Sequence, residues 1–216
     1  MQYGISILLS GISLGGQYAL IAIGYTMVYG ILRLINFAHG DVFMVAGLMM
    51  IYLSASLPLA AAIPLMIILT VLLGFIIERA AYKPLRTAPR MSVMISAIGV
   101  SYLLQNLATY VTGGQPMTYP TIGILNKTID IVGTSTKLVV IITPVLVLVL
   151  IVLLTQLINH TKIGMAMRAV SKDFETARLM GIKINNVISM TFVIGSALAV
   201  VGSILYFTTY PAITPT

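Results

Sequence analysis

The stretch that decides how this chain is organised runs from Lys162 to Lys183, KIGMAMRAVSKDFETARLMGIK. Its apolar residues recur in alternating steps of four and three positions, which places one apolar stripe along a helix. The stripe consists of Ile163, Met167, Val170, Phe174 and Ala177, and charged residues surround it. The pattern predicts a short basic amphipathic helix, which could lie on a lipid surface, cap its own bundle or dock into a groove on a partner. A solvated connecting loop with a helical turn is the plainer alternative.

The rest of the chain is far more apolar than a water-soluble domain. Of its 216 residues, 59% are hydrophobic and 8% are charged, whereas about a quarter of the residues in soluble domains are charged. The hydrophobic runs have about the 20-residue length of a transmembrane helix, and the alternating ten-residue segments of a membrane barrel are absent. We therefore predict an all-α integral membrane protein, a polytopic bundle of about six transmembrane helices within the lipid bilayer.

The charged loops predict how the six spans are oriented. The spans are expected at Gly4–Gly30, Gly40–Ser54, Leu59–Ile77, Met91–Val111, Leu138–Ile158 and Val187–Phe207. Ten Lys and Arg residues follow the first, third and fifth spans, and only Lys127 and Lys137 lie on the other side. Because basic loops stay in the cytoplasm, the Lys162–Lys183 segment is expected to be cytoplasmic and the N-terminus outside. Close helix packing is expected at the GxxxG pair formed by Gly11 and Gly15.

Signals of an enzyme are missing from the sequence. No P-loop pattern is present, there is no cysteine, and the two histidines, His39 and His160, have no metal-binding spacing. We expect no catalytic residue, no metal and no cofactor in this chain. The net charge of +7 follows from membrane topology, so we expect no nucleic-acid partner.

Polar residues inside or beside the spans are candidates for a translocation path, because such groups are costly in a membrane. One cluster, RLINFAHGD at Arg33 to Asp41, lies between the first two spans, and Arg33 could pair with Asp41 across this turn. The candidates are Gln17, Asn36, His39, Asp41, Gln105 and Asn106. Each could instead hold a turn or bond a neighbouring helix.

Two segments resemble a known family. GGQYALIAIGYTMVYGILRLINFAHGD, Gly15 to Asp41, resembles the N-terminal part of permease subunits of branched-chain amino acid ABC importers, the LivH type. RAVSKDFETARLMGI, Arg168 to Ile182, and TFVIGSALAVVGSIL, Thr191 to Leu205, are similar to the coupling segment and next span of that family. The resemblance covers essentially the whole chain. Permeases for urea and short-chain amides share much of the pattern and are an alternative.

The resemblance implies a permease subunit in a bacterial or archaeal plasma (inner) membrane that forms a path for branched-chain amino acids. It implies a second permease of the LivM type, two separate ATPase subunits that use ATP and Mg²⁺, and a periplasmic or extracellular substrate-binding protein. The implied coupling residues are Arg168, Val170, Asp173, Phe174, Glu175, Ala177 and Gly181. Residues 1–216 would form one permease domain that lacks the last spans of the family. An ATPase-independent channel or secondary transporter is the alternative from another class.

Overall fold

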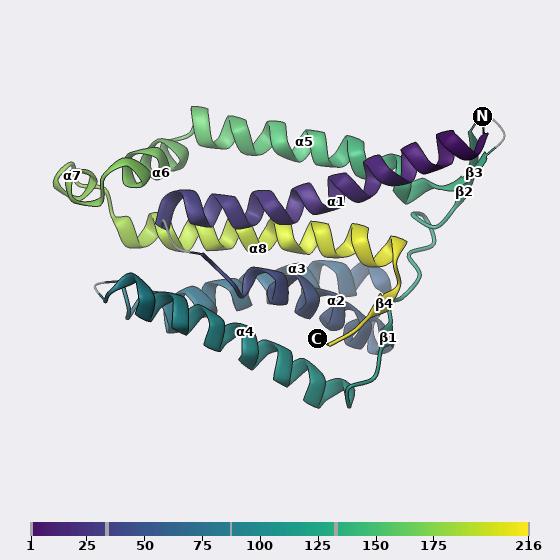
Figure 1. Cartoon of the computed structure of the whole chain (residues 1–216), viewed down its shortest axis with the longest axis horizontal. Helices are drawn as coiled ribbons and strands as arrows, with labels where there is room; N and C mark the ends of the chain where they lie inside the picture. The colour runs from purple at the N-terminus through teal and green to yellow at the C-terminus, as the bar shows by residue number, and fades with distance from the viewer. Residues whose placement is uncertain (1, 33–34, 87, 132–133, 216) are drawn as a thin grey trace.

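Six long helices make up most of the protein in a computed structural model that describes residues 2–32, 35–86, 88–131 and 134–215 (Figure 1). They are α1 (Gln2–Leu32), α2 (His39–Ser56), α3 (Leu59–Ile77), α4 (Arg90–Thr112), α5 (Leu138–His160) and α8 (Ile184–Thr209). All six are long and apolar enough to cross a membrane. The predicted all-α polytopic fold is confirmed.

The helix boundaries lie close to the predicted spans, because prolines and apolar runs mark them. Pro58 precedes α3, which begins and ends at the predicted residues, and Pro89 precedes α4. A π-helical stretch, η1 (Glu78–Tyr82), continues α3. The short second span does not extend into residues 35–38, since α2 begins at His39.

The central helix of the bundle is α8. It lies between α1 on one side and α2 and α3 on the other, with α5 against α1 and α4 against α2 (Figure 1). Small residues allow the closest approaches: a Cβ atom added to Gly74 of α3 would lie 2.8 Å from the Cβ of Ser196 on α8. Gly11 and Gly15 behave differently, since a Cβ at either would meet no atom within 4 Å. Among the described residues, no other helix of this chain packs against that pair, and its predicted role in helix packing stays a prediction.

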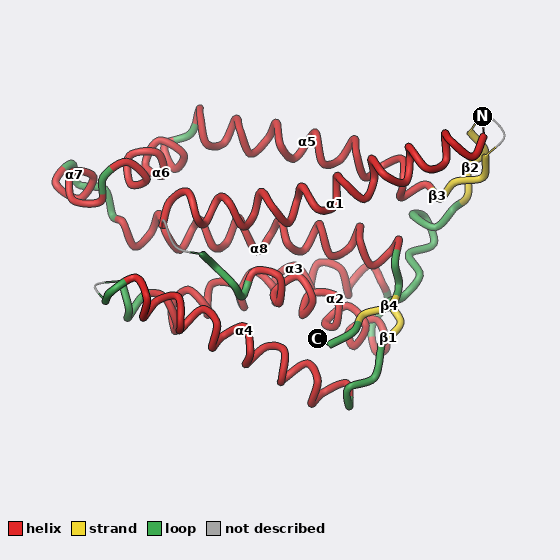
Figure 2. The backbone as a smooth tube through the Cα atoms, viewed as in Figure 1, coloured by secondary structure: helices red, strands yellow, loops and turns green. Residues whose placement is uncertain are grey.

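Two small antiparallel pairs of strands lie at one end of the bundle (Figure 2). Strand β1 (Met117–Thr118) pairs with β4 (Ala212–Ile213), and β2 (Thr128–Ile131) pairs with β3 (Thr134–Lys137). Ile213 is only 1% exposed and lies close to Gly47 of α2. The last described residues are thereby anchored in the bundle.

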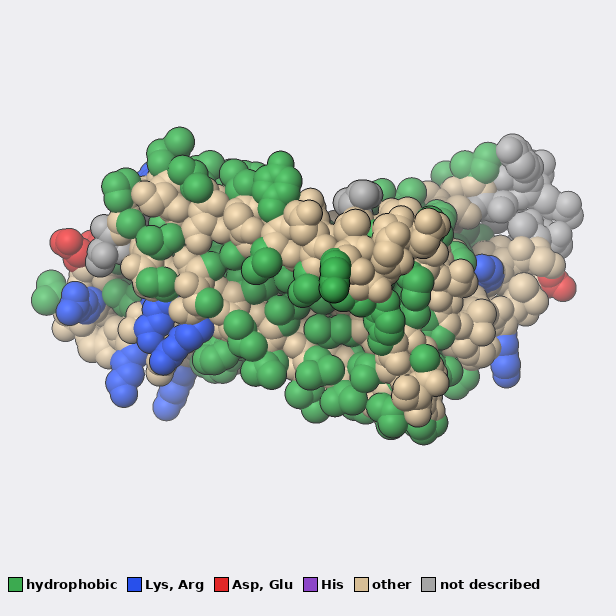
Figure 3. All heavy atoms as spheres, turned by 90° about the horizontal axis from the view of Figure 1, so that it is seen from below, with side chains coloured by type: hydrophobic (Ala, Val, Ile, Leu, Met, Phe, Trp, Pro, Cys, Tyr) green, Lys and Arg blue, Asp and Glu red, His purple; other side chains and the backbone are tan. Residues whose placement is uncertain are grey.

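The opposite end of the bundle carries most of the positive charge. We call it the basic end; it comprises residues 79–90 and 162–183, and Figure 3 shows Lys and Arg side chains gathered there. Lys127 and Lys137 lie at the end that holds β2 and β3. This separation is the one that the loop charges predicted, and Arg33 lies outside the described residues.

Candidate functional site at the basic end

The Lys162–Lys183 segment forms two helices rather than the single one predicted. They are α6 (Lys162–Lys172) and α7 (Phe174–Leu179), and the backbone between them is extended at Asp173. The Asp173 carboxylate accepts a hydrogen bond from the backbone N–H of Glu175, at 2.9 Å, and another from the Thr176 hydroxyl. Asp173 is therefore the N-cap of α7, and this competing local bond is the physical reason that the helix breaks.

Most of the apolar stripe of this segment faces its own bundle, and only Ile163 at its start is exposed, at 41%. Met167, Val170 and Ala177 are buried and pack in one cluster with Ile31 of α1 and Val187 of α8. Val170 is 0% and Ala177 3% exposed. The sequence left three placements of the stripe open: on a lipid surface, on its own bundle or in a groove of a partner. In the structure it caps its own bundle. Val170 and Ala177 are therefore buried within the chain and do not offer a surface to a partner, and their role in coupling stays a prediction.

Other residues that were expected to couple this chain to an ATPase also have structural roles within the chain. Arg168 donates hydrogen bonds to the Asn159 side chain and carbonyl near the end of α5, at 3.1 and 3.3 Å. Gly181 has a φ of +81°, where glycine is favoured, and the N–H of Ile182 then donates to the carbonyl of Ala177. Gly181 thus ends α7 with a tight turn. Glu175 is exposed on the outer side of α7.

A groove of about 480 Å³ opens between α6 and α7. Its lining residues are Lys162, Met165, Ala166, Ala169, Lys172, Asp173, Thr176, Ala177, Met180 and Ile182. Large apolar side chains beside it are exposed: Met165 is 62%, Leu179 86% and Met180 80% exposed. Sequence reasoning missed these three because they lie off the apolar stripe. The sequence does place these three large apolar residues among the charged residues of the segment, and that position could have indicated an exposed contact surface.

Several of the candidate path residues form hydrogen bonds to neighbouring helices. Gln17 on α1 donates to the Thr209 hydroxyl on α8 at 3.2 Å. Asp41 on α2 accepts from the Gln105 side chain on α4 at 2.9 Å. Each of these hydrogen bonds joins two spans, which is the alternative that the sequence left open.

The three remaining path candidates differ in their surroundings. Asn36 accepts a hydrogen bond from the Tyr82 hydroxyl at 2.8 Å. Asn106 is exposed and donates to the carbonyl of Tyr102 in its own helix at 2.7 Å. His39 is 3% exposed, and a Cβ at Gly24 would lie 2.6 Å from its Nε2. Among the described residues this Nε2 has no hydrogen-bond partner.

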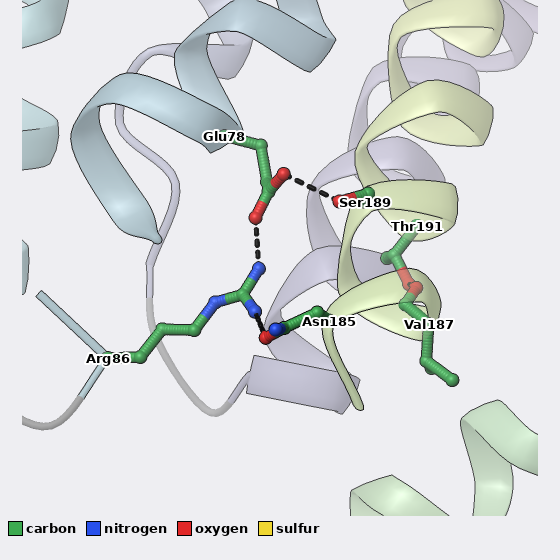
Figure 4. A network of polar contacts seen from close by, with 6 residues as sticks. All are labelled: Glu78, Arg86, Asn185, Val187, Ser189 and Thr191. Carbon is green, nitrogen blue, oxygen red and sulfur yellow. Dashed lines mark hydrogen bonds and ion pairs between the residues drawn. The ribbon is translucent and has the colours of Figure 1, made fainter. Parts of the chain in front are cut away.

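An ion pair at the basic end, in which the carboxylate is buried and the arginine is partly exposed, was not predicted (Figure 4). Glu78 is 0% exposed, and its carboxylate accepts hydrogen bonds from the Arg86 guanidinium and, at 2.7 Å, from the Ser189 hydroxyl on α8. Arg86 also donates to Asn185. Burial lowers the pKa of Arg86, and the neighbouring Glu78 carboxylate opposes this shift. The sequence placed Glu78 beside Arg79, but its partner lies eight positions along the chain.

Comparison with known proteins identifies relatives over nearly the full chain. BraD of Pseudomonas aeruginosa, a high-affinity branched-chain amino acid transport system permease protein, is 40% identical over 224 residues, which cover 96% of this chain and 72% of BraD. LivH of Salmonella typhimurium is 40% identical and LivH of Escherichia coli K12 37%, each over 99% of this chain and 73% of the relative. No solved structure matches the chain.

A protein family also matches residues 7–216, described as "Branched-chain amino acid transport system / permease component". The six apolar helices agree with such a multi-pass membrane protein. The resemblance seen in Gly15–Asp41 and Arg168–Ile182 is thereby confirmed. The chain belongs to the family of permease components of branched-chain amino acid transport systems.

Proposed function

We propose that this chain is the permease subunit of an ATP-driven importer and that it forms, with a second permease, a path for branched-chain amino acids. The observation that carries the proposal is the family match over residues 7–216, together with relatives of 37–40% identity that are named as high-affinity permeases for this substrate class. The chain would reside in a bacterial or archaeal plasma membrane, with the basic end in the cytoplasm. A substrate-binding protein would deliver the amino acid on the other side.

The groove between α6 and α7 is the proposed docking site for a separate ATPase subunit. Its walls are mostly apolar and include the exposed Met165 and Met180, two lysines, Lys162 and Lys172, and one carboxylate, Asp173. This surface suits a partner segment with apolar side chains and acidic residues around them. ATP and Mg²⁺ would be bound by the two ATPase subunits, and this chain would carry no cofactor.

The buried stripe would transmit movement rather than make the docking contact. Val170 and Ala177 pack against the ends of α1 and α8, and Arg168 holds α6 to the end of α5. A displacement of α6 and α7 therefore acts on three spans at once. Closure of the ATPase dimer would favour one conformation of the permease, since a partner shifts an equilibrium only through different affinities for the two states.

Uptake into proteoliposomes tests the transport function. The chain is reconstituted with the candidate second permease, both ATPases and the binding protein, and labelled leucine is compared with labelled urea. Leucine uptake that requires ATP and every subunit is expected. Urea uptake in place of leucine would overturn the substrate class, and uptake without the ATPases would favour a channel or secondary transporter.

Cross-linking tests the docking site, and the chain suits this experiment because it contains no cysteine. A single Met180→Cys variant, labelled with a photoactivatable reagent, is expected to capture an ATPase subunit. Ile124→Cys is the matched control, because Ile124 is 72% exposed but lies in the segment between β1 and β2, away from the basic end. Equal capture at both positions would contradict docking on the groove.

A further inference from the structure

A second cavity at the basic end lies beside the first turn of α8. Its volume is about 600 Å³, and its walls come from the end of α1, the loop after η1, α7 and the start of α8. Three cationic side chains line it: Arg86, Arg178 and Lys183. No carboxylate is among the lining residues. The cavity therefore has a strongly positive rim.

The start of α8 adds to this positive field. The helix has 26 residues and begins at Ile184 without a side-chain cap, so the positive end of its dipole faces the same region. Glu78 offsets the charge of Arg86, and the Nε of Arg86 is buried with no partner among the described residues. Arg178 and Lys183 are exposed, and neither forms an ion pair within the described chain. Their charges remain available to an anion.

Apart from Asn185 and Asn186, the remaining lining residues of the cavity are apolar. Leu32 is the last residue of α1, Ile184 is the first of α8, and Ile188 lies one turn further in. The cavity thus lies where two spans leave the membrane. A free phosphate ion would use only the cationic rim, whereas an amphiphile would use the rim and the apolar wall together.

We propose that this cavity binds an anionic phospholipid of the cytoplasmic leaflet. Its phosphate lies between Arg178, Lys183 and the start of α8, and its acyl chain lies along Leu32 and Ile188. Two charged donors and a helix N-terminus are a recurrent arrangement for phosphate binding. This inference is independent of which substrate is transported and of ATP coupling, so it stands or fails separately from the proposed function.

Native mass spectrometry of the purified full chain tests the proposal. The probes are palmitoyl-oleoyl phosphatidylglycerol and the zwitterionic phosphatidylcholine with the same acyl chains. We expect the wild type to retain phosphatidylglycerol selectively, and the Arg178→Gln/Lys183→Gln variant to retain it about tenfold less, because two charge-assisted contacts are lost. Circular dichroism verifies that the variant is folded.

The control removes the same number of charges from the same end of the protein. Arg79 and Arg90 are exposed and do not line the cavity, so Arg79→Gln/Arg90→Gln is expected to leave phosphatidylglycerol retention unchanged. An equal loss in both double variants would overturn the proposal in favour of general surface charge.

Two further arms separate the lipid from other anions. If excess inorganic phosphate binds the wild type in phosphatidylcholine nanodiscs and phosphatidylglycerol shows no selective retention, the cavity is a free-phosphate site and the lipid proposal is wrong. If the assembled ATPase subunits displace the retained phosphatidylglycerol completely, the cavity belongs to the protein interface, which also overturns it. Retention in the presence of both supports the lipid.

Discussion

The ion pair between Glu78 and Arg86 provides the sharpest test of how the basic end is held together. Arg86→Met keeps a long side chain but removes the cation that faces the fully buried Glu78 carboxylate. Among the described residues, the carboxylate then retains only the Ser189 hydroxyl as a donor. We expect a severe loss of stability, since a buried charge without its partner is strongly unfavourable.

The expected magnitudes follow from what each change leaves behind. Arg86→Met should lower the free energy of unfolding by about 3–5 kcal/mol, the range for breaking a buried pair from one side. Ser189→Ala removes one hydrogen bond to a charged group and should cost about 1.5–3 kcal/mol. The double variant Glu78→Met/Arg86→Met should cost less than Arg86→Met alone, because apolar replacement of both partners is often close to neutral.

The assay is reversible unfolding in mixed micelles titrated with sodium dodecyl sulfate, followed by the helical circular dichroism signal. Arg79→Met is the control, because Arg79 is next to Glu78 in the sequence but is exposed. It should be within about 0.5 kcal/mol of the wild type, as is usual for surface substitutions. The reasoning is refuted if Arg86→Met is no worse than this control, or if the double variant is less stable than Arg86→Met.

Three further substitutions test other contacts by the same unfolding assay. Gly74→Ala should lower the free energy of unfolding by about 1–3 kcal/mol through overpacking, because its Cβ would lie 2.8 Å from the Ser196 Cβ. Adding Ser196→Gly should restore part of this loss, and the absence of any rescue would contradict the close approach of the two helices. Gln17→Leu should lower the free energy of unfolding by no more than about 1 kcal/mol, since it loses the donations to the Thr209 hydroxyl and the Leu205 carbonyl but also removes a buried oxygen without a partner among the described residues; a larger loss would show that Gln17 contributes more than these two bonds. Gly181→Ala should cost about 1–2 kcal/mol because of its positive φ, and Gly181→Asn should cost less; equal losses would argue against backbone strain.

The positions of the spans could be predicted well because they depend on local properties. A run of about 20 apolar residues must be helical in a membrane, where every backbone polar group needs a partner within the chain. Proline marks the starts of α3 and α4, and basic residues mark the loops of one end. None of these signals requires knowledge of how the helices pack.

The break between α6 and α7 at Asp173 could be predicted from the sequence only in part. The period of apolar residues in the Lys162–Lys183 segment continues across Asp173, so the stripe predicted one helix. An aspartate followed by Phe-Glu-Thr is, however, also a typical start of a helix. The local capping signal was present but was outweighed by the period. The structure shows that capping prevailed.

The partners of polar residues could not be predicted from the sequence. Glu78 had Arg79 beside it, yet it is bonded to Arg86 and Ser189, and Asp41 is bonded to Gln105. A buried polar group must find a partner, but which helix supplies it depends on the order in which the helices pack. That order is a property of the whole bundle.

By itself, the sequence determined the membrane class, the six spans, the charged end and the family, since each follows from composition, local periodicity or motifs along the chain. Only the tertiary structure decided which way the Lys162–Lys183 stripe faces. An apolar stripe is equally suited to packing on the protein's own bundle and to docking on a partner. The burial of Val170 and Ala177 against α1 and α8 shows that this stripe packs on the bundle. The same packing left Met165 and Met180 exposed in a groove, with the exposed Leu179 next to Met180, because none of the described helices covers these side chains.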